Sequence, residues 1–391
     1  MSEEMNGDSR EVQSKVRYGR FLSLSRTLAL GSSVSLGLGV FVLLGLALDT
    51  AGTRAPLSYG LTAIVFLPLV LAYAERALAI PTGEGVFRLG RSDEPSWLAY
   101  ADDWLAYGGF AGLIGLLGWG VAFHLNQLLV RLFDISVEEA YLAIAVIMLV
   151  AINRAFGRQG TWRTRMRFVY ISVPLLVVIF GIGWVSAGQM PSLMFVLRTP
   201  GDIVLAVALL AGMLWGTGLI LDQRDQVRRP VRNLPPALYL ALLIGSITGL
   251  LAAMMVLKYP GIGIGVRLPL AVIASQTSSV LELVYLSLGV LICIIALDRI
   301  FISSLRTVGA MMAQGFIPTQ VGIGKKFKVS VNRLFLITLL SVIILLVVSF
   351  ELLVSVIGLI FLLMTILVFI RDLVKPRASL PDHRGLKLPF H

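Results

Sequence analysis

Two short glycine-containing stretches lie in the middle of long apolar segments, where interrupted backbone could bind a polar molecule. GLG occupies residues 37–39 in the first apolar segment, and WGTG occupies residues 215–218 in the sixth. Glycine weakens a helix, and an interrupted helix in a membrane leaves amides and carbonyls to be satisfied by other groups. Free amides at a helix N-terminus would bind a carboxylate, and free carbonyls would accept hydrogen bonds from an ammonium group.

The alternative interpretation is that these glycines only allow helices to pack closely, as small residues do in membrane proteins. For one segment alone, close packing would be the simpler explanation. The two segments lie five apart and run in opposite directions. Matched glycine interruptions in two halves of opposite topology favour a transporter site between inverted repeats.

Composition places these segments in a bilayer. The 391 residues are 57% hydrophobic and only 14% charged, whereas soluble proteins have about 25% charged residues. We therefore expect an all-α integral membrane protein with about ten transmembrane helices. The apolar segments lie near 25–48, 56–79, 103–130, 139–156, 168–187, 202–222, 237–257, 279–303, 332–350 and 352–370.

The distribution of basic residues orients these segments. Of the 33 Lys and Arg residues, 27 fall in the tails and alternate connections and five fall in the opposite connections; Arg299 lies inside a segment. Because cytoplasmic loops are enriched in Lys and Arg, both termini are predicted to be cytoplasmic in a multi-pass plasma-membrane protein. The net charge of +11 is explained by this topology, so no nucleic-acid partner is predicted.

The predicted organisation has four parts. Residues 1–24 form a cytoplasmic N-terminal tail, 25–187 the first five-helix repeat, 202–370 the second inverted repeat, and 371–391 a cytoplasmic C-terminal tail. A single cysteine, Cys293, excludes an internal disulfide. The sequence carries no signal for an oligomeric state.

Five stretches, in order along nearly the whole chain, resemble segments of the amino acid–polyamine–organocation (APC) superfamily of permeases. They are LGLGVF at 36–41, YAE with IPTGEG at 73–85, DQVRRPVRNLPPA at 225–237, RTVGAMMAQGFIP at 306–318 and RGLKLPF at 384–390. The resemblance implies a five-plus-five inverted repeat of the LeuT-like type, with broken helices 1 and 6. It also implies a secondary transporter of amino acids or related amines that works by alternating access within the lipid bilayer.

Carried over position by position, the resemblance also implies a substrate site between the broken helices. The amides of the first break would hold the substrate carboxylate, and backbone groups of the second would meet its ammonium group and begin the side-chain pocket. These positions are Gly37, Leu38, Gly39 and Val40, and Leu214, Trp215, Gly216 and Thr217. Two alternatives stay open: a non-transporting amino acid sensor of the same fold, and a transporter subunit that needs a partner protein.

Transport could be coupled to a proton or a sodium ion. The candidate residues for binding this ion are Asp298, Ser303 and Ser304 in the eighth segment. Charges inside a span are often functional. The alternative is that Asp298 and Arg299 lie near the cytoplasmic face and are solvated or paired.

Other ionisable groups in the spans are few. Some proton-coupled members of the family place a lysine in helix 5, but residues 168–181, FVYISVPLLVVIFG, contain no charged residue. His124 could titrate near neutrality, although we interpret it as a hydrogen-bonded structural histidine. The sequence shows no P-loop, no Cys/His metal cluster and no Ser-His-Asp context. We therefore predict no enzymatic activity, no metal site and no organic cofactor.

Overall fold

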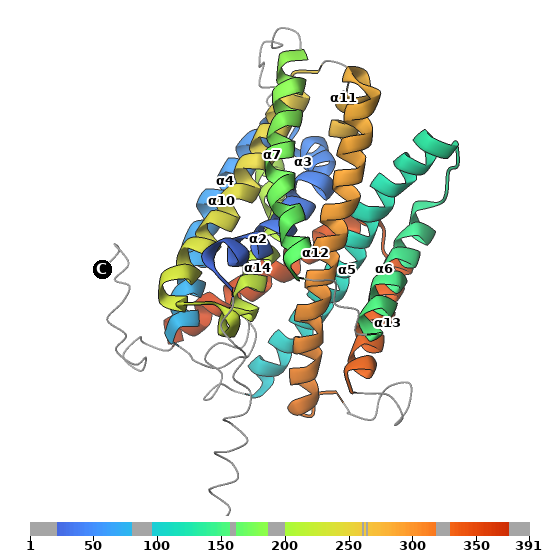
Figure 1. Ribbon diagram of the computed structural model, residues 1–391. Helices are drawn as coiled ribbons and strands as arrows, with labels where there is room; N and C mark the ends of the chain where they lie inside the picture. Colours follow the sequence, from blue (N-terminus) through green and yellow to red (C-terminus); the bar gives the residue numbers. More distant parts are fainter. Residues whose placement is uncertain are drawn as a thin grey trace, which may run out of the picture.

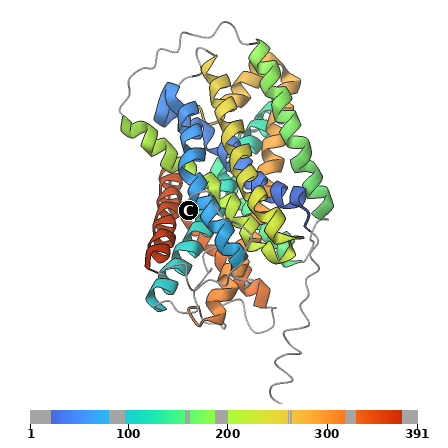
Figure 2. The same ribbon diagram turned by 90° about the vertical axis from the view of Figure 1, so that its left-hand side faces the viewer.

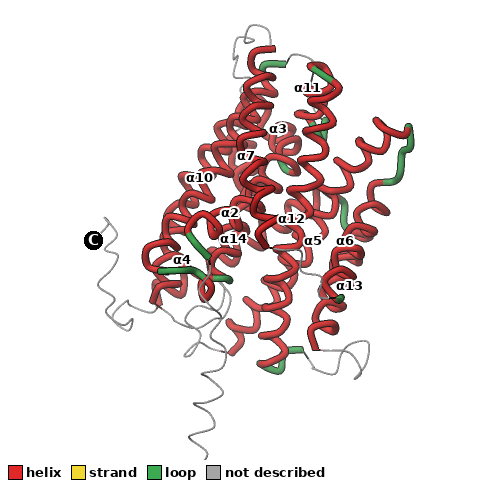
Figure 3. Tube along the Cα trace, in the orientation of Figure 1, coloured by secondary structure: helices red, strands yellow, loops and turns green. Residues whose placement is uncertain are grey.

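A computed structural model of the chain describes residues 22–79, 96–156, 162–186, 200–259, 262, 265–317 and 329–374, and these residues are almost entirely helical (Figure 3). The first half contains α2 (Leu24–Leu36), η1 (Gly37–Val42), α3 (Leu44–Ala51), η2 (Gly52–Arg54), α4 (Ala55–Ala79), α5 (Ser96–Phe133), α6 (Glu139–Ala155) and α7 (Trp162–Ser186). The second half contains α8 (Pro200–Leu210), η5 (Ala211–Leu214), α9 (Trp215–Asp222), η6 (Arg224–Gln226), α10 (Pro230–Leu257), α11 (Pro269–Thr277), α12 (Ser279–Ala313), α13 (Val329–Val347) and α14 (Phe350–Val374).

Local sequence explains several helix ends. Gly52 ends α3 at a φ of 57°, a conformation that favours glycine. Pro230 and Pro269 lie at the starts of α10 and α11, where the missing N–H costs no hydrogen bond. The Ser278 hydroxyl accepts from the Val280 amide at 3.2 Å and so caps α12.

Eight helical stretches of the described residues are long and apolar enough to cross a membrane, which indicates a multi-pass membrane protein. They are Leu24–Val42, Leu44–Ala72, Tyr100–Phe133, Phe168–Ser186, Gly201–Leu221, Pro230–Leu257, Ser279–Ala313 and Phe350–Leu367. Predicted segments four and nine correspond to shorter helices: α6 has 17 residues, and the apolar part of α13 is Val331–Val347.

The first of these stretches lies at the centre of the molecule. Of its apolar window, 83% is buried, against 33% for Phe168–Ser186 in α7. Figure 1 shows α4 and α10 on one side of α2 and α5, α6 and α13 on the other, and α12 packs along α5. Figure 2 shows α14, in red, next to α8 at one edge. The glycine-containing segments are therefore enclosed by other helices.

The ends of the central helices are tied to neighbouring segments. At one end, the Leu22 amide donates to the Gln226 carbonyl at 2.9 Å, and the Arg228 amide donates to the Leu22 carbonyl at 2.8 Å. This bridge joins the start of α2 to the segment after α9. At the other end, the Gly265 amide donates to Oδ1 of Asp49 in α3 at 2.7 Å. We refer to these as the Leu22 end and the Asp49 end.

Candidate functional site

The predicted interruption in the first segment is a change of helix type. The α-helix α2 continues as the π-helix η1, and the Leu43 amide bonds the Leu38 carbonyl five residues earlier at 2.8 Å. The Gly37 amide donates to the carbonyls of Ser33 and Val34, so it is engaged within the helix in this conformation. The backbone remains helical here, and π-helical turns are frequent at functional sites.

The second segment changes helix type in a different way. The α-helix α8 tightens into the 3-10 helix η5, and α9 follows from Trp215. The eight predicted substrate-site residues are thereby divided between η1, the last residue of η5 and the first turn of α9. All eight are buried.

Polar side chains from neighbouring helices reach the backbone carbonyls of both segments. The Tyr59 hydroxyl of α4 donates to the Gly39 carbonyl through a short hydrogen bond. The Cys293 thiol of α12 lies 3.9 Å from the Gly37 carbonyl. In η5, the Met213 carbonyl accepts from the Ser35 hydroxyl of α2 at 3.2 Å. Each donor compensates a carbonyl in a region without bulk water.

Sequence analysis did not identify these donors. Tyr59 is a fully buried tyrosine in an apolar helix, and a buried tyrosine usually finds a partner for its hydroxyl. A Cβ atom at Gly249 of α10 would lie 2.2 Å from the Tyr59 ring, so the glycine provides its space. A tyrosine within an apolar segment indicates a buried hydroxyl that needs an acceptor. The sequence does not show that this acceptor is the Gly39 carbonyl of another helix.

The glycines of the two segments have different surroundings. A Cβ atom at Gly216 would lie 2.5 Å from the Gly31 carbonyl oxygen and 2.8 Å from the Ser35 hydroxyl. Gly216 therefore allows close packing of α9 on α2. At this position the structure supports the interpretation that the glycine serves helix packing. A Cβ atom at Gly39 would lie 3.1 Å from Sδ of Met213, a flexible side chain. Gly39 thus faces η5 across a contact that can adjust.

Aromatic rings surround both segments. The Trp215 ring packs against Phe110 at 5.1 Å and Phe361 at 5.9 Å between ring centroids. In η1, the Phe41 ring stacks on Tyr285 at 5.4 Å and meets the His124 ring edge-on at 5.5 Å. Leu214 is buried, and its carbonyl accepts from the Thr217 hydroxyl at 2.6 Å.

Asp298, the first coupling candidate, is engaged in ion pairs. Arg154 of α6 donates through Nε to Oδ1 of Asp298 at 2.7 Å and through Nη2 to its backbone carbonyl at 3.1 Å. Arg299 lies 3.6 Å from the other carboxylate oxygen. The structure thus places this carboxylate in a buried charge cluster that joins α12 to α6. Its role in coupling stays a prediction.

The two serine candidates lie on other faces of α12. Because α12 is continuous and an α-helix turns roughly 100° per residue, Ser303 and Ser304 are turned away from Asp298. The Ser304 hydroxyl donates to the Phe301 carbonyl at 2.9 Å. The Ser303 hydroxyl is buried and has no partner among the residues that the structure describes. Ser303 and Ser304 thus do not share the helix face of Asp298, and their role in coupling stays a prediction.

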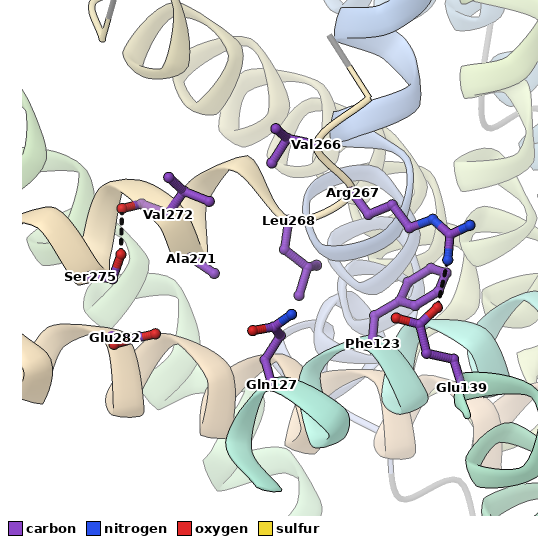
Figure 4. A pocket seen from close by; sticks show the side chains of 10 residues that line it. All are labelled: Phe123, Gln127, Glu139, Val266, Arg267, Leu268, Ala271, Val272, Ser275 and Glu282. Atoms are coloured by element: carbon purple, nitrogen blue, oxygen red, sulfur yellow. Dashed lines mark hydrogen bonds and ion pairs between the residues drawn. The ribbon is translucent and has the colours of Figure 1, made fainter. Parts of the chain in front are cut away.

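A pocket of about 270 Å³ opens near the Asp49 end, between α5, α11 and α12 (Figure 4). Figure 4 shows Gln127 and Leu268 pointing into it and Glu282 at its side. Arg267 forms an ion pair with Glu139 at 2.5 Å and lies over the Phe123 ring at 4.9 Å. Both acidic and basic groups thus line the pocket.

Three solved membrane-transport proteins share this fold. The structure of MhsT in complex with L-phenylalanine matches with a TM-score of 0.63 at 16% identity, over 88% of this chain and 87% of that chain. Mhp1, a nucleobase-cation-symport-1 family transporter, matches with a TM-score of 0.59 at 10% identity, over 91% and 79%. A Na⁺-coupled sialic acid symporter matches with a TM-score of 0.52 at 13% identity, over 88% and 78%. The architecture is therefore that of LeuT-fold transporters.

Sequence comparison points in the same direction. Proteins named as uncharacterized transporters in Mycobacterium bovis and Mycobacterium tuberculosis are 25% identical over 258 residues, or 65% of this chain. The matched part spans 56% of the length of these relatives. The family model described as amino acid permease matches residues 22–379. The chain is a multi-pass membrane protein that belongs to the amino acid permease family of the APC superfamily.

Proposed function

We propose that the chain carries amino acids or related amines across the plasma membrane by alternating access, with the substrate held between η1 and η5. The observation that carries this proposal is the meeting of two changes of helix type inside the molecule. Ser35 of α2 bonds the Met213 carbonyl of η5, and Gly39 of η1 faces the Met213 side chain. The end of α2 and η1 thus contact η5 close to the positions where both segments depart from α-helical geometry.

The proposed architecture has ten spans in two inverted repeats. The first span is α2, η1 and α3, and the sixth is α8, η5 and α9. The shorter helices α6 and α13 serve as spans four and nine. The distribution of Lys and Arg supports a cytoplasmic Leu22 end and cytoplasmic termini. Labelling of a cysteine at residue 160 from outside the cell would contradict this topology, because 157–161 is assigned to a cytoplasmic loop.

The proposed substrates are neutral, apolar amino acids. Amides of η1 would bind the carboxylate once the Gly37 amide is released from its bonds within the helix. The apolar and aromatic surroundings of η5, with Leu214 and Trp215, suit an apolar side chain. MhsT, which shares the fold, was solved in complex with L-phenylalanine.

The test is counterflow in proteoliposomes preloaded with an equimolar mixture of the twenty proteinogenic amino acids. Radiolabelled amino acid should enter preloaded vesicles faster than unloaded ones if the chain exchanges substrate. Liposomes without protein control for leakage. Thermal-shift measurements with single amino acids then identify the substrate. Absence of both exchange and thermal stabilisation would contradict the transporter proposal.

A further inference from the structure

His124 lies deep in α5, beside η1, and one of its ring nitrogens lacks a partner among the described residues. The side chain is fully buried, and Nδ1 lies 2.8 Å from the Gly120 carbonyl oxygen. A carbonyl oxygen only accepts hydrogen bonds, so Nδ1 carries the proton and Nε2 presents a lone pair. No described group donates to Nε2. The predicted hydrogen bond of His124 is confirmed at Nδ1. Nε2 is left as an unprotonated base.

The backbone of α12 fixes the orientation of this ring. A Cβ atom at Gly289 would lie 2.1 Å from Cδ2 and 2.4 Å from Nε2 of His124. Any larger residue at position 289 would therefore displace the imidazole. The close approach holds the ring against Phe41 of η1 and 5.7 Å from the Tyr285 ring.

We propose that His124 binds a coupling proton on Nε2, and that this proton and the substrate carboxylate bind together; the inference rests on the proposed function. Protonation adds one N–H bond to the Nε2 lone pair and converts the imidazole to an imidazolium. A buried imidazolium is unfavourable without a counter-charge. A carboxylate bound by the amides beside Phe41 would supply that charge, and linkage requires each ligand to strengthen the other by the same factor.

The groups around His124 leave this counter-charge to the substrate. The titratable side chains of α12 nearest to His124 are Tyr285 and Cys293, and both are neutral near pH 7. The π-helix η1 carries no titratable side chain. Tyr59 of α4, which is also neutral near pH 7, donates to the Gly39 carbonyl of η1. The remaining charged residues of the helices packed around α5 and α12 lie toward the two ends: Asp49, Arg131, Glu139, Arg267, Glu282 and Glu351 at one, and Asp102, Asp103, Arg154, Asp298, Arg299, Arg306 and Arg333 at the other.

The pocket at the Asp49 end supplies a route for the proton. Phe123 and Gln127, which line it, flank His124 on α5, and Glu282 lies one turn from Tyr285 on α12. Figure 4 shows the Gln127 amide pointing into this pocket. Gln127 lies about one helical turn from His124 along α5, whereas Asp298 is already paired with Arg154.

The first experiment is ¹⁵N NMR of histidine-labelled protein in nanodiscs. The chain has three histidines, and His383→Asn with His391→Asn leaves His124 alone. We expect the Nδ1–H tautomer at high pH. In the presence of the mixture of twenty amino acids, Nε2 should gain a proton between about pH 5 and pH 8. An Nε2–H tautomer, or a ring that stays neutral across this range, would overturn the inference.

The second experiment compares counterflow with accumulation driven by a pH gradient, using the radiolabelled mixture of twenty amino acids and acid outside. One pH unit supports about tenfold accumulation for one proton. His124→Gln, whose amide does not take up a proton near neutrality, should retain counterflow and lose accumulation. Val130→Ala, at an exposed position of α5 outside the pocket, should retain both.

The outcomes separate the two proposals. If the parent protein shows no counterflow, the proposed function fails, whatever the NMR shows. If it shows counterflow without accumulation under the pH gradient, or if His124→Gln accumulates as the parent does, His124 is not the coupling site. If His124→Gln fails to fold, the NMR titration of the parent histidine decides.

Discussion

The two changes of helix type, η1 and η5, occur at equivalent places in the sequence but have different neighbours. Around η1 lie groups that can donate, accept or bind protons, namely Tyr59, Cys293 and His124. Around η5 lie apolar and aromatic side chains, with Phe361 of α14 against Trp215. In the proposed site, η1 therefore recognises the polar end of the substrate and η5 its side chain.

The same comparison separates two uses of glycine. At Gly216 in α9, a side chain would collide with the backbone of α2. At Gly39 in η1, a side chain would meet the movable end of Met213. Gly216 is thus a packing requirement, whereas Gly39 faces a contact that can adjust.

The largest effect is expected at Asp298, because α12 supports η1 and is joined to α6 through this residue. Asp298→Asn leaves the partly buried Arg154 without its charge partner and should lower the free energy of unfolding by about 3 kcal/mol. The measurement is an SDS titration in mixed micelles. Adding Arg154→Gln should restore much of the loss. A single variant of normal stability that loses only gradient-driven accumulation would instead support a coupling role for Asp298.

The next effect is expected where α9 meets α2. Gly216→Ala forces a methyl group against the Gly31 carbonyl and should cost about 1–3 kcal/mol in the same titration. Gly212→Ala in η5 is the matched control, since its Cβ atom would meet only Ile357 at 3.7 Å. Equal stability of the two variants would show that Gly216 is not a packing position.

A smaller effect is expected from the side chains that bond the two segments. Tyr59→Phe removes the donor to the Gly39 carbonyl and should cost about 1 kcal/mol. Ser35→Ala removes the longer bond to the Met213 carbonyl and should cost less. Substrate affinity should fall more in Tyr59→Phe, because that bond belongs to the carboxylate-binding segment. A larger loss of substrate affinity in Ser35→Ala than in Tyr59→Phe would contradict the proposal that η1 binds the carboxylate and η5 the side chain.

The smallest effect on stability, with the largest on binding, is expected for Gly39→Val. A branched side chain restricts the backbone of η1 and fills the space that a carboxylate needs, while Met213 can move aside. We expect a folded protein that shows no thermal shift with amino acids. Gly181→Val in α7, where a Cβ atom would meet no atom within 4 Å, controls for a β-branched residue in a span. Unchanged affinity in Gly39→Val would place the glycine in a packing role.

Local patterns anticipated where most helices lie. The segment predicted at 56–79 is α4, Ala55–Ala79, and the one predicted to begin at 279 is α12, which begins at Ser279. Apolar runs and capping residues act over a few neighbours, so they can be recognised along the chain. Helical periodicity also places Ser303 and Asp298 on different faces of α12, because an α-helix turns roughly 100° per residue.

The composition was sufficient to predict a membrane-embedded helical protein, because solubility in lipid is a property of short stretches, and the resemblance of five stretches to the APC superfamily predicted the permease family. The partners of the interrupted backbone required the folded chain. Cys293 and Gly37 are 256 residues apart, Ser35 and Met213 are 178 apart, and Arg154 and Asp298 are 144 apart. Which side chain reaches a carbonyl in a dry interior depends on how distant helices pack, and packing across such separations leaves no periodic trace in the sequence.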